Sequence, residues 1–470
     1  MLDIGPDLSN RLFSDFDFSN GAVVAVSGGS DSTALLFLLK DHIDRTSPAS
    51  RLLAVTIDHD LRPGSAAEAQ AVAKLCADHG MAHRTLVWSG RKPSSGLPAA
   101  AREARYRLLA EAARAEGINV ILTGHTADDQ AETVLMRQAR HQGGRLEGTD
   151  DDEAREDGRG LAGMAPATLY DWRAWIVRPL LGMRRQALRE VLRRRNLGWI
   201  EDPTNTDPRF ERPRIRVSLG GDEGERRFAE AIAKAGQVAA ERVELGRRAA
   251  MLIGTLASLP GPGLIRLDHD YAAGEDSEAA VFVLRVLLAT AGGASFLPDE
   301  ARCRALFDRL GAGPFCATLS RTVVDARRAG VFLHREARNL PSATTAVDNR
   351  LWDGRRRITL GDRSGGLVIA PLGPAAARRV PTAGNAPQSL LRAALAAEPA
   401  LWRYGERLDF AGDDAVPPAG ATAPAVAPFA RFLPSFDLQP AAALATLIGA
   451  PPLPPPPFRG HDPGGAWAKA

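Results

Sequence analysis

The sequence predicts an α/β fold, with a doubly wound parallel sheet over about residues 1–215. Two observations predict it. Short apolar runs typical of buried strands alternate with segments that have the apolar spacing of helices. The units follow one another as strand, loop and helix, an order that favours a parallel sheet with helices on both faces. In such sheets ligands bind at the carboxyl ends of the strands, so the residues after each strand are candidate site residues.

The first strand and the loop after it are the most informative feature of the chain. The apolar run 23–26 (VVAV) is followed at once by a glycine and serine turn, and 32–40 (STALLFLLK) has helical spacing. Gly28 and Gly29 let the backbone approach a ligand, while free N–H groups at the helix start and serine hydroxyls supply donors. The turn therefore predicts a phosphate-binding loop, made of Ser27, Gly28, Gly29, Ser30, Asp31 and Ser32. It matches neither G-x-x-x-x-G-K-[ST] nor G-x-G-x-x-G.

The second predicted strand, 52–57 (LLAVTI), also ends in polar residues. Asp58, His59 and Arg62 follow it, and they are expected on the same rim of the sheet as the first loop. His59 has two interpretations of equal weight, a histidine that orders the loop or one that contacts a ligand directly.

The third predicted strand, 84–88, precedes a long helix over 99–116 (AAAREARYRLLAEAARAE). Arginines lie near the start of this helix, at Arg102, Arg105 and Arg107. Since the helix begins near the sheet edge that binds ligands, one of these arginines is expected to face the site.

The fourth predicted strand, 120–123, is followed by GHTADDQAET (124–133) and a helix that continues to Arg140. Asp129 and Glu132 are three residues apart and therefore share one face of the first helical turn. Two carboxylates placed in this way can hold Mg²⁺ or grip a cationic substrate. The alternative is that they only offset the helix dipole, which favours acids at this end.

Composition excludes several classes of protein. The chain has 470 residues, 45% hydrophobic and 24% charged, which is ordinary for a soluble protein of two to four domains. No apolar stretch is long enough to suggest a membrane segment, so a cytoplasmic location is expected. Cys76, Cys303 and Cys316 are far apart and form no C-x-x-C pair, which argues against a zinc ribbon, an iron–sulfur site or a disulfide framework.

The net charge of +3 alone does not indicate a nucleic-acid partner. Residues 173–216, however, contain twelve arginines and five acidic residues. This excess of positive charge is equally consistent with contacts to a phosphate backbone and with the general use of arginine in place of lysine in this chain.

Seven segments of the N-terminal half resemble, in order, those of the bacterial tRNA(Ile)-lysidine synthetases, a branch of the PP-loop (N-type) ATP pyrophosphatases. The combination of H-x-x-D-D-Q-x-E-T with E-D-P-T-N is specific to this branch, and the remainder of the chain matches loosely. The segments are SGGSDS (27–32), DHDLRPGS (58–65), AAREARYRLL (100–109), TGHTADDQAETVLMR (123–137), GLAGMAP (160–166), RPLLGMRRQALREVL (178–192) and WIEDPTNTDPRFERPRIR (199–216).

The resemblance implies a two-step reaction. ATP activates the C2 oxygen of the wobble cytidine in a tRNA(Ile) with a CAU anticodon, and free L-lysine then displaces AMP to give lysidine. Lysine's amines are cationic and need carboxylates, and its ε-amine must lose a proton before it attacks. The sequence leaves open which carboxylate is the base, how a tRNA(Met) with the same anticodon is excluded, and the oligomeric state, for which a homodimer is compatible with the resemblance.

The resemblance also implies roles for particular residues. Residues 27–32 would hold the phosphates, with Asp31 aiding a Mg²⁺ ion, and Arg105 would support ATP or the adenylate. Asp129 and Glu132 would receive lysine. Further candidate contacts to ATP or the adenylate are His59, Arg62 and His125, and candidate tRNA contacts are Arg184, Arg185, Arg212, Arg214 and Arg216.

Two departures from the family pattern stand out. An insertion within 140–163 carries seven acidic residues over 147–157, beside the expected substrate entrance. It is expected to be a mobile acidic loop that repels tRNA phosphates unless it swings clear. The second departure is Pro213, between Arg212 and Arg214, where the family has asparagine; proline removes a backbone donor, so altered local geometry is expected.

Beyond the catalytic domain, 1–218, the sequence predicts a helical domain over 219–315 and a small α+β C-terminal module over 316–430. The helical domain contains a long helix over 223–259 that Pro260 ends, and it is expected to contact tRNA. Segments 318–335 and 351–369 each alternate like strand pairs. The module is interpreted either as a tRNA-binding domain or as a stabilising appendage. Residues 431–470 are expected to be a Pro/Ala-rich tail, flexible over the last twenty residues.

Two other classes of function stay open. Another PP-loop tRNA-modifying or amidating enzyme would need a glutaminase domain or reactive cysteines, and neither is visible in the sequence. A non-enzymatic RNA-binding scaffold would not need Asp31, Asp129 and Glu132, which are all present.

Overall fold

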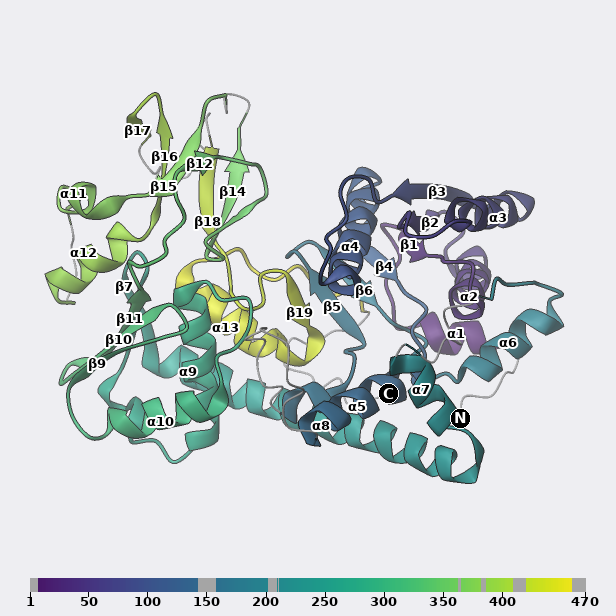
Figure 1. The fold of residues 1–470 in the computed structure, drawn as a ribbon, viewed down its shortest axis with the longest axis horizontal. Coiled ribbons are helices and arrows are strands. Elements are labelled where there is room, and N and C mark those ends of the chain that lie inside the picture. The colour runs from purple at the N-terminus through teal and green to yellow at the C-terminus, as the bar shows by residue number, and fades with distance from the viewer. Residues whose placement is uncertain are drawn as a thin grey trace.

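The computed structural model describes residues 7–142, 158–201, 209, 211–361, 365–381, 386–408 and 420–458. Figure 1 shows the N-terminal α/β domain on one side and the strand-rich C-terminal half on the other, with the 36-residue helix α8 (Gly221–Leu256) running beneath both. The acidic insertion at 147–157 lies outside the described residues. No helix among the described residues combines the length and the apolar character needed to cross a membrane.

The N-terminal domain is built on a seven-stranded sheet in the order β19-β5-β6-β4-β1-β2-β3. The five strands from β6 to β3 are parallel, β5 is antiparallel to β6, and β19 is antiparallel to β5. The predicted parallel sheet is thereby confirmed. Its strands are β1 (Ala22–Ala25), β2 (Leu52–Asp58), β3 (Ala82–Val87), β4 (Val120–Leu122), β5 (Ala167–Tyr170), β6 (Ala174–Val177) and β19 (Phe432–Pro434).

Helices cover both faces of this sheet. Consecutive residues of β1 point to opposite faces: Val24 packs into a core that contains Leu35, and Val23 packs into one that contains Leu109. Side chains alternate in this way along any strand, so a strand buried on both faces has to be apolar throughout. The helices are α1 (Leu8–Phe13), α2 (Ser30–Thr46), α3 (Ser65–Asp78), α4 (Leu97–Ala115), α5 (Ala127–Gln142) and α6 (Arg185–Arg194).

The middle of the chain is not purely helical, which corrects the boundary expected at 315/316. A five-stranded antiparallel sheet, ordered β7-β8-β11-β10-β9, takes strands from both sides of that boundary. The long helix ends at Leu256, not at Leu259 as predicted, because the chain is already extended from Ala257 and Pro260 lies within β7; Pro262 and Gly263 then turn the chain into the hairpin β7–β8. The elements are α7 (Glu211–Ser218), β7 (Ala257–Gly261), β8 (Leu264–Leu267), α9 (Ser277–Gly292), α10 (Glu300–Leu310), β9 (Phe315–Leu319), β10 (Thr322–Arg327) and β11 (Gly330–Arg335).

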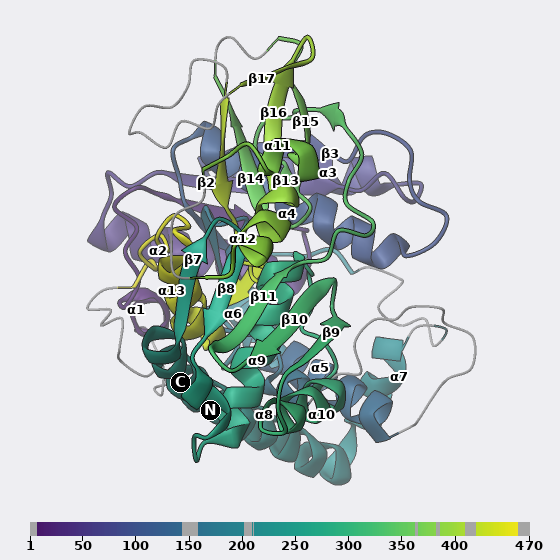
Figure 2. The same ribbon diagram turned by 90° about the vertical axis from the view of Figure 1, so that its left-hand side faces the viewer.

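Two small sheets form the C-terminal module, at the top of Figure 2. The strand pair predicted over 351–369 is confirmed for β13 and β14, whereas β15 joins the other sheet. The first sheet contains β12 (Thr344–Thr345), β15 (Val368–Pro371), β16 (Pro399–Arg403) and β17 (Glu406–Leu408). The second contains β13 (Leu351–Trp352), β14 (Arg356–Leu360) and β18 (Gly420–Pro424), and the helices are α11 (Gly373–Ala377) and α12 (Gln388–Ala396).

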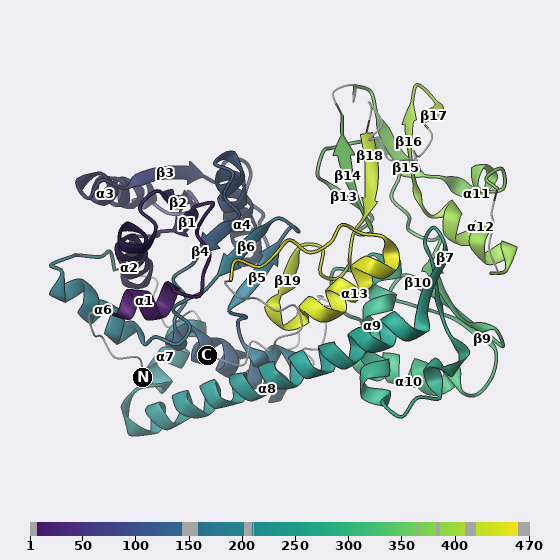
Figure 3. The same cartoon turned by 180° about the vertical axis from the view of Figure 1, so that it is seen from behind.

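The C-terminal segment is not a tail over its described length, which corrects the expectation for 431–458. It returns to the first domain, where β19 extends the sheet and α13 (Leu438–Ile448) packs on α8, as Figure 3 shows from behind. Beyond α13 the proline-rich segment accepts hydrogen bonds from two indoles, Trp172 Nε1 to Pro451 O at 3.1 Å and Trp175 Nε1 to Pro455 O at 3.0 Å. Residues 459–470 lie outside the described residues.

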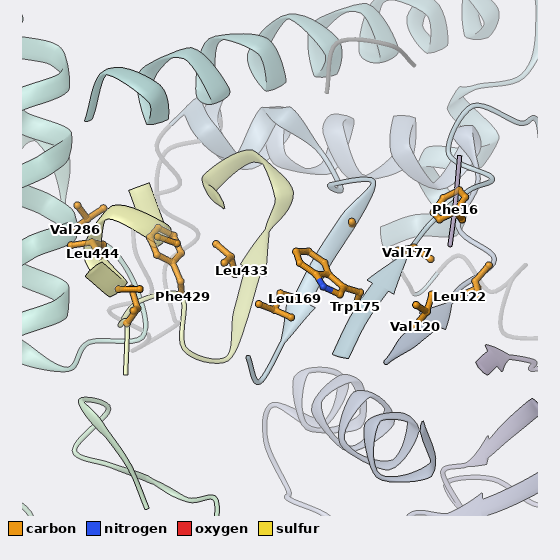
Figure 4. Close-up of a cluster of buried hydrophobic side chains, with 14 of the residues drawn as sticks. Phe16, Val120, Leu122, Leu169, Trp175, Val177, Val286, Phe429, Leu433 and Leu444 are labelled. Carbon is orange, nitrogen blue, oxygen red and sulfur yellow. The ribbon is translucent and has the colours of Figure 1, made fainter. Parts of the chain in front are cut away.

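This returning segment joins the two halves of the core. In Figure 4 a continuous row of buried apolar side chains runs from Val286 of α9 through Leu444 and Leu433 to Leu169 and Trp175 of the seven-stranded sheet. Because the segment fills the space between the halves with apolar side chains, its burial stabilises their relative placement.

Candidate functional site

The loop 27–32 has the geometry of an anion cradle. It follows β1, and α2 begins within it at Ser30, so N–H groups of the first helical turn point outward. Ser32 Oγ accepts from Ser27 N at 3.1 Å and donates to Gly29 O at 3.2 Å, which fixes the turn. Gly28 has φ +84°, and a Cβ there would lie 2.6 Å from Ile200. Both backbone strain and lack of space therefore require glycine at this position.

The predicted carboxylates come together beside this loop. Asp31 lies in the first turn of α2, while Asp129 and Glu132 lie in the first turns of α5. One guanidinium, that of Arg185 at the start of α6, reaches all three: Nε to Asp31 Oδ2 at 2.8 Å, Nη2 to Asp129 Oδ1 at 3.0 Å, and Nη1 to Glu132 Oε1 at 3.6 Å. We call these four residues, with Arg216, the site cluster. Its carboxylates belong to helices that follow β1 and β4, which are adjacent in the sheet.

The remaining bonds of the cluster hold each carboxylate in place. Asp129 Oδ2 accepts from Thr126 N and from Thr126 Oγ1, both at 2.9 Å. Arg216, from α7, donates from Nε to Glu132 Oε1 at 2.6 Å and from Nη2 to Glu132 Oε2 at 3.3 Å. The two predicted lysine-binding acids therefore carry specific partners, which a role limited to offsetting the helix dipole does not require.

The carboxylates of the cluster differ in acidity. Burial raises the pKa of Asp31 above its usual value, although Arg185 opposes the shift. Burial also acts to raise the pKa of Asp129, but Arg185, His125 and the bonds from Thr126 together hold it below the usual value. Asp129 is thus an anion over the whole physiological range and suits a cationic ligand.

Two histidines of the rim are neutral at physiological pH. Burial and the charge of Arg105 lower the pKa of His59 to about 4. Burial and the charge of Arg178 lower that of His125 to about 3, and its Nδ1 lies 2.9 Å from Thr123 Oγ1. His59 lies edge-on to Trp88, and its buried Nδ1 has no hydrogen-bond partner. Neither interpretation of His59 is decided by these contacts.

The predicted arginines divide into those at the site and those away from it. Arg105 acts on the pKa values of both histidines, so it lies near the rim, and Arg212 lies close enough to affect Arg105 in turn. Arg62 instead pairs with Glu68 of α3 at 2.7 Å. Arg184 pairs with Glu225 of α8 at 2.9 Å and stacks on Phe228, so it ties α6 to α8.

The arginines of the 211–216 segment have different surroundings. Arg212 and Arg214 are exposed on α7, whereas Arg216 faces Glu132. Pro213 is buried in the first turn of α7, where a missing N–H costs no helical hydrogen bond. Residues 202–208 and 210 lie outside the described residues, so most of the E-D-P-T-N segment is not placed.

Sequence reasoning missed the position of Arg185 and the role of Gly124. Arg185 and Arg216 were predicted to contact tRNA, but the structure directs both at the site carboxylates. A Cβ on Gly124 would lie 2.9 Å from the Ser32 backbone, so glycine lets the end of β4 approach the start of α2. The G-H-T sequence after an apolar strand is a signal for such a close approach.

The fold and this loop define a class, the PP-loop ATP-binding domains, and the profile described as "PP-loop domain" matches residues 9–222. A tRNA(Ile)-lysidine synthase from Mesorhizobium japonicum is 65% identical over 463 residues, 98% of this chain and 100% of that protein. One from Brucella anthropi is 38% identical over 420 residues, 86% of this chain and 88% of that protein. The chain therefore belongs to the tRNA(Ile)-lysidine synthase family, and it is an ATP-using ligase, as the sequence predicted.

Among solved structures, the U34-tRNA thiolase NcsA from Methanococcus maripaludis matches with a TM-score of 0.37 and 16% identity, covering 50% of this chain and 75% of that one.

Proposed function

We propose that this enzyme joins free L-lysine to C2 of the wobble cytidine in a tRNA(Ile) with a CAU anticodon, with ATP cleaved to AMP and diphosphate. The product, lysidine, changes the codon read from AUG to AUA. The observation that carries the proposal is the site cluster. In it the guanidinium of Arg185 lies within 3.6 Å of Asp31, which belongs to the phosphate-binding loop, and of the carboxylate pair Asp129 and Glu132. A polyphosphate and a cationic amine can therefore meet at one place.

The loop is suited to the phosphates of ATP. N–H groups at the start of α2 and the serine hydroxyls donate to phosphate oxygens, and the helix dipole favours negative charge there. Arg105, with Arg212 near it, adds positive charge close to the rim. These groups bind the nucleotide so that its α-phosphorus faces the cytidine O2, which forms the new P–O bond as diphosphate leaves.

Asp31 is suited to a Mg²⁺ ion. Its carboxylate is a hard oxygen ligand beside the phosphate cradle, and Mg²⁺ in nucleotide sites is held by one or two carboxylates together with the substrate phosphates. When bound, the ion would neutralise charge that develops on the diphosphate leaving group.

Asp129 and Glu132 are suited to the amine of lysine. Glu132 is nearly inaccessible, at 1% side-chain exposure, and both acids carry positioned partners, so they form a fixed anionic pair. The amine nitrogen, once deprotonated, attacks C2 of the adenylated cytidine, the C2–O bond breaks and AMP leaves.

The exposed arginines of α7, Arg212 and Arg214, are the best-placed candidates for tRNA phosphates. They lie beside Arg216, so a tRNA bound there would bring its anticodon to the site cluster. Contact of the helical domain with tRNA and a homodimer both stay predictions; light scattering of the free enzyme and of its tRNA complex would test the second.

A thiolating enzyme of the same class is the less favoured alternative. Such chemistry needs an activated thiolate, which forms where the pKa is lowered. Burial instead raises the pKa of Cys76 to about 11 and that of Cys303 to about 12. Cys316 is exposed on β9, far along the chain from the loop.

Incorporation of labelled lysine into transcripts tests the proposal. We expect label, AMP and diphosphate with a tRNA(Ile) transcript that has the CAU anticodon, and no label when its wobble cytidine is replaced by uridine. Glu132→Gln is expected to lose most of the labelling, whereas the exposed Glu111→Gln on α4 keeps it. AMP release without lysine incorporation would indicate that the enzyme catalyses another PP-loop reaction.

A further inference from the structure

The side chain of Arg185 is bonded to the carboxylate oxygens that the two proposed ligands, lysine and Mg²⁺, would use. Its Nη2 donates to Asp129 Oδ1, and the other oxygen of Asp129 already accepts two hydrogen bonds from Thr126. Its Nη1 faces Glu132 Oε1, and both oxygens of Glu132 accept from Arg216. Each oxygen of this pair thus already accepts a bond, and Asp129 Oδ1 is the one whose hydrogen bond comes from Arg185, so the guanidinium stands where an ammonium group would approach it.

The same guanidinium also covers the carboxylate predicted to bind Mg²⁺. Arg185 Nε donates to Asp31 Oδ2 at 2.8 Å, while Asp31 Oδ1 accepts from Ser30 Oγ at 3.0 Å. A cation that binds Asp31 must displace the arginine from it, since a positive ion and a guanidinium repel each other at contact distance. One side chain thus links two ligand positions.

Arg185 has the freedom that such a role requires. Among the described residues, the hydrogen bonds and ion pairs of its side chain go to carboxylates of the site, and its side chain is 19% exposed. Its backbone, in contrast, is anchored, because its N–H donates to Asp128 Oδ2 at 2.7 Å at the start of α6. The guanidinium can therefore leave the acids while the helix stays where it is.

We propose that Arg185 is a positioning residue that makes nucleotide binding precede lysine binding. Without nucleotide, it serves as the internal counter-ion of Asp31, Asp129 and Glu132 and blocks lysine. When ATP binds with its cation at Asp31, the guanidinium turns to the phosphates, which are the nearest new anions, and uncovers Asp129 Oδ1 for lysine, while Arg216 keeps its bonds to Glu132. This inference rests on the lysine and magnesium sites of the proposed function.

Lysine binding measured by calorimetry tests this order. The wild-type enzyme is titrated with L-lysine alone and with Mg²⁺ and α,β-methylene-ATP, which is not cleaved. We expect lysine to bind at least about tenfold more tightly with the nucleotide, equivalent to about 1.4 kcal/mol. In Arg185→Gln the two affinities should agree within about twofold, because the block is gone, and diphosphate release should be slower.

Two further variants make the test specific. Arg193→Gln removes an exposed arginine of the same helix, which pairs with Glu190 outside the site cluster, and should keep the tenfold ratio. Arg185→Lys keeps the charge but cannot span three carboxylates, so an intermediate ratio is expected; it also serves if Arg185→Gln does not fold.

The outcomes separate this inference from the proposed function. Equal lysine affinity with and without nucleotide in the wild type, or a tenfold ratio that persists in Arg185→Gln, overturns the role of Arg185 alone. A wild-type enzyme that binds no lysine in either condition, and labels no tRNA, overturns the lysine site itself.

Discussion

The molecule contains two arginine–carboxylate clusters that differ in how their charges are held. In the site cluster, Arg185 and Arg216 are 19% and 27% exposed, and among the described residues the guanidinium of Arg185 bonds to carboxylates. A second cluster, the domain-joining cluster, connects β10, β11 and the end of α9 to the β13–β14 turn and the end of α12. Its members are Arg321, Arg335, Asp353, Arg355 and Glu398.

In the domain-joining cluster the guanidinium groups of Arg335 and Arg355 are held in place by burial and by bonds to the backbone, whereas Arg321 is 41% exposed. Arg335 is 1% exposed and donates to Asp353 and to backbone carbonyls of residues 336, 338 and 339. Arg355 binds Asp353, Glu398 and the carbonyl of Ala397. Bonds to carbonyls cannot be exchanged for a ligand without unfolding the turn that provides them. Guanidinium and carboxylate groups therefore stabilise the fold in the domain-joining cluster. In the site cluster the same groups form ion pairs that a charged ligand can replace.

The largest expected effect is on ATP cleavage. Asp31→Ala should abolish AMP formation, a loss of at least about 10³-fold, because it removes the carboxylate beside the phosphate cradle. The free energy of unfolding should change by less than about 1 kcal/mol, since Arg185 keeps two other acids. Radiometric AMP release and urea unfolding measure both, with Asp44→Ala, an exposed acid of α2, as control. A stable variant with normal AMP release would show that Asp31 has no role in ATP cleavage.

Asp353→Asn should have the opposite profile. It leaves buried arginines without a full counter-charge, which costs about 3 kcal/mol of unfolding free energy. ATP cleavage by the folded fraction should stay near the wild-type rate. The control is Asp325→Asn, which breaks a more exposed pair with Arg327 and should cost less than about 1 kcal/mol. If the two variants lost the same free energy of unfolding, the domain-joining cluster would contribute no more to stability than an exposed ion pair.

Asp129→Ala should mainly raise the lysine requirement. Losing one bond to a charged group costs about 1.5–3 kcal/mol, so the KM for lysine should rise about 10- to 100-fold. AMP formation at saturating lysine should fall far less. Steady-state labelling at varied lysine, compared with varied ATP, measures the difference. An unchanged KM for lysine would show that the lysine site lies elsewhere.

The contrast between the two clusters also shows what sequence can predict. The loop 27–32 and the first turn of α5 were found because their contacts are local: glycine, serine and acid spacing fixes them within a few residues. The inward position of Arg185 could not be predicted because its partners lie in helices α2 and α5, remote in sequence, and an arginine-rich segment gives no sign of which arginine turns inward.

The C-terminal segment shows the same limit. Its proline and alanine content predicts a flexible tail, since such composition buries little apolar surface by itself. Trp172 and Trp175 supply partners that the segment lacks by itself, because carbonyls of the proline-rich segment accept hydrogen bonds from their indole N–H groups. No local pattern links these indoles to residues some 280 positions later.

The smallest expected effect is on acid stability. His59 and His125 are neutral in the fold, with pKa values of about 4 and about 3, below the usual 6.5. The unfolded chain therefore binds protons that the fold does not, and stability is lost as pH falls below about 6.5. His125→Asn, which can keep a bond to Thr123, should reduce the loss between pH 7 and pH 5 by about 1 kcal/mol. His79→Asn, an exposed histidine at the end of α3, is the control. Urea unfolding at both pH values measures the difference, and equal pH dependence in all three proteins would mean that the fold does not lower the pKa of His125.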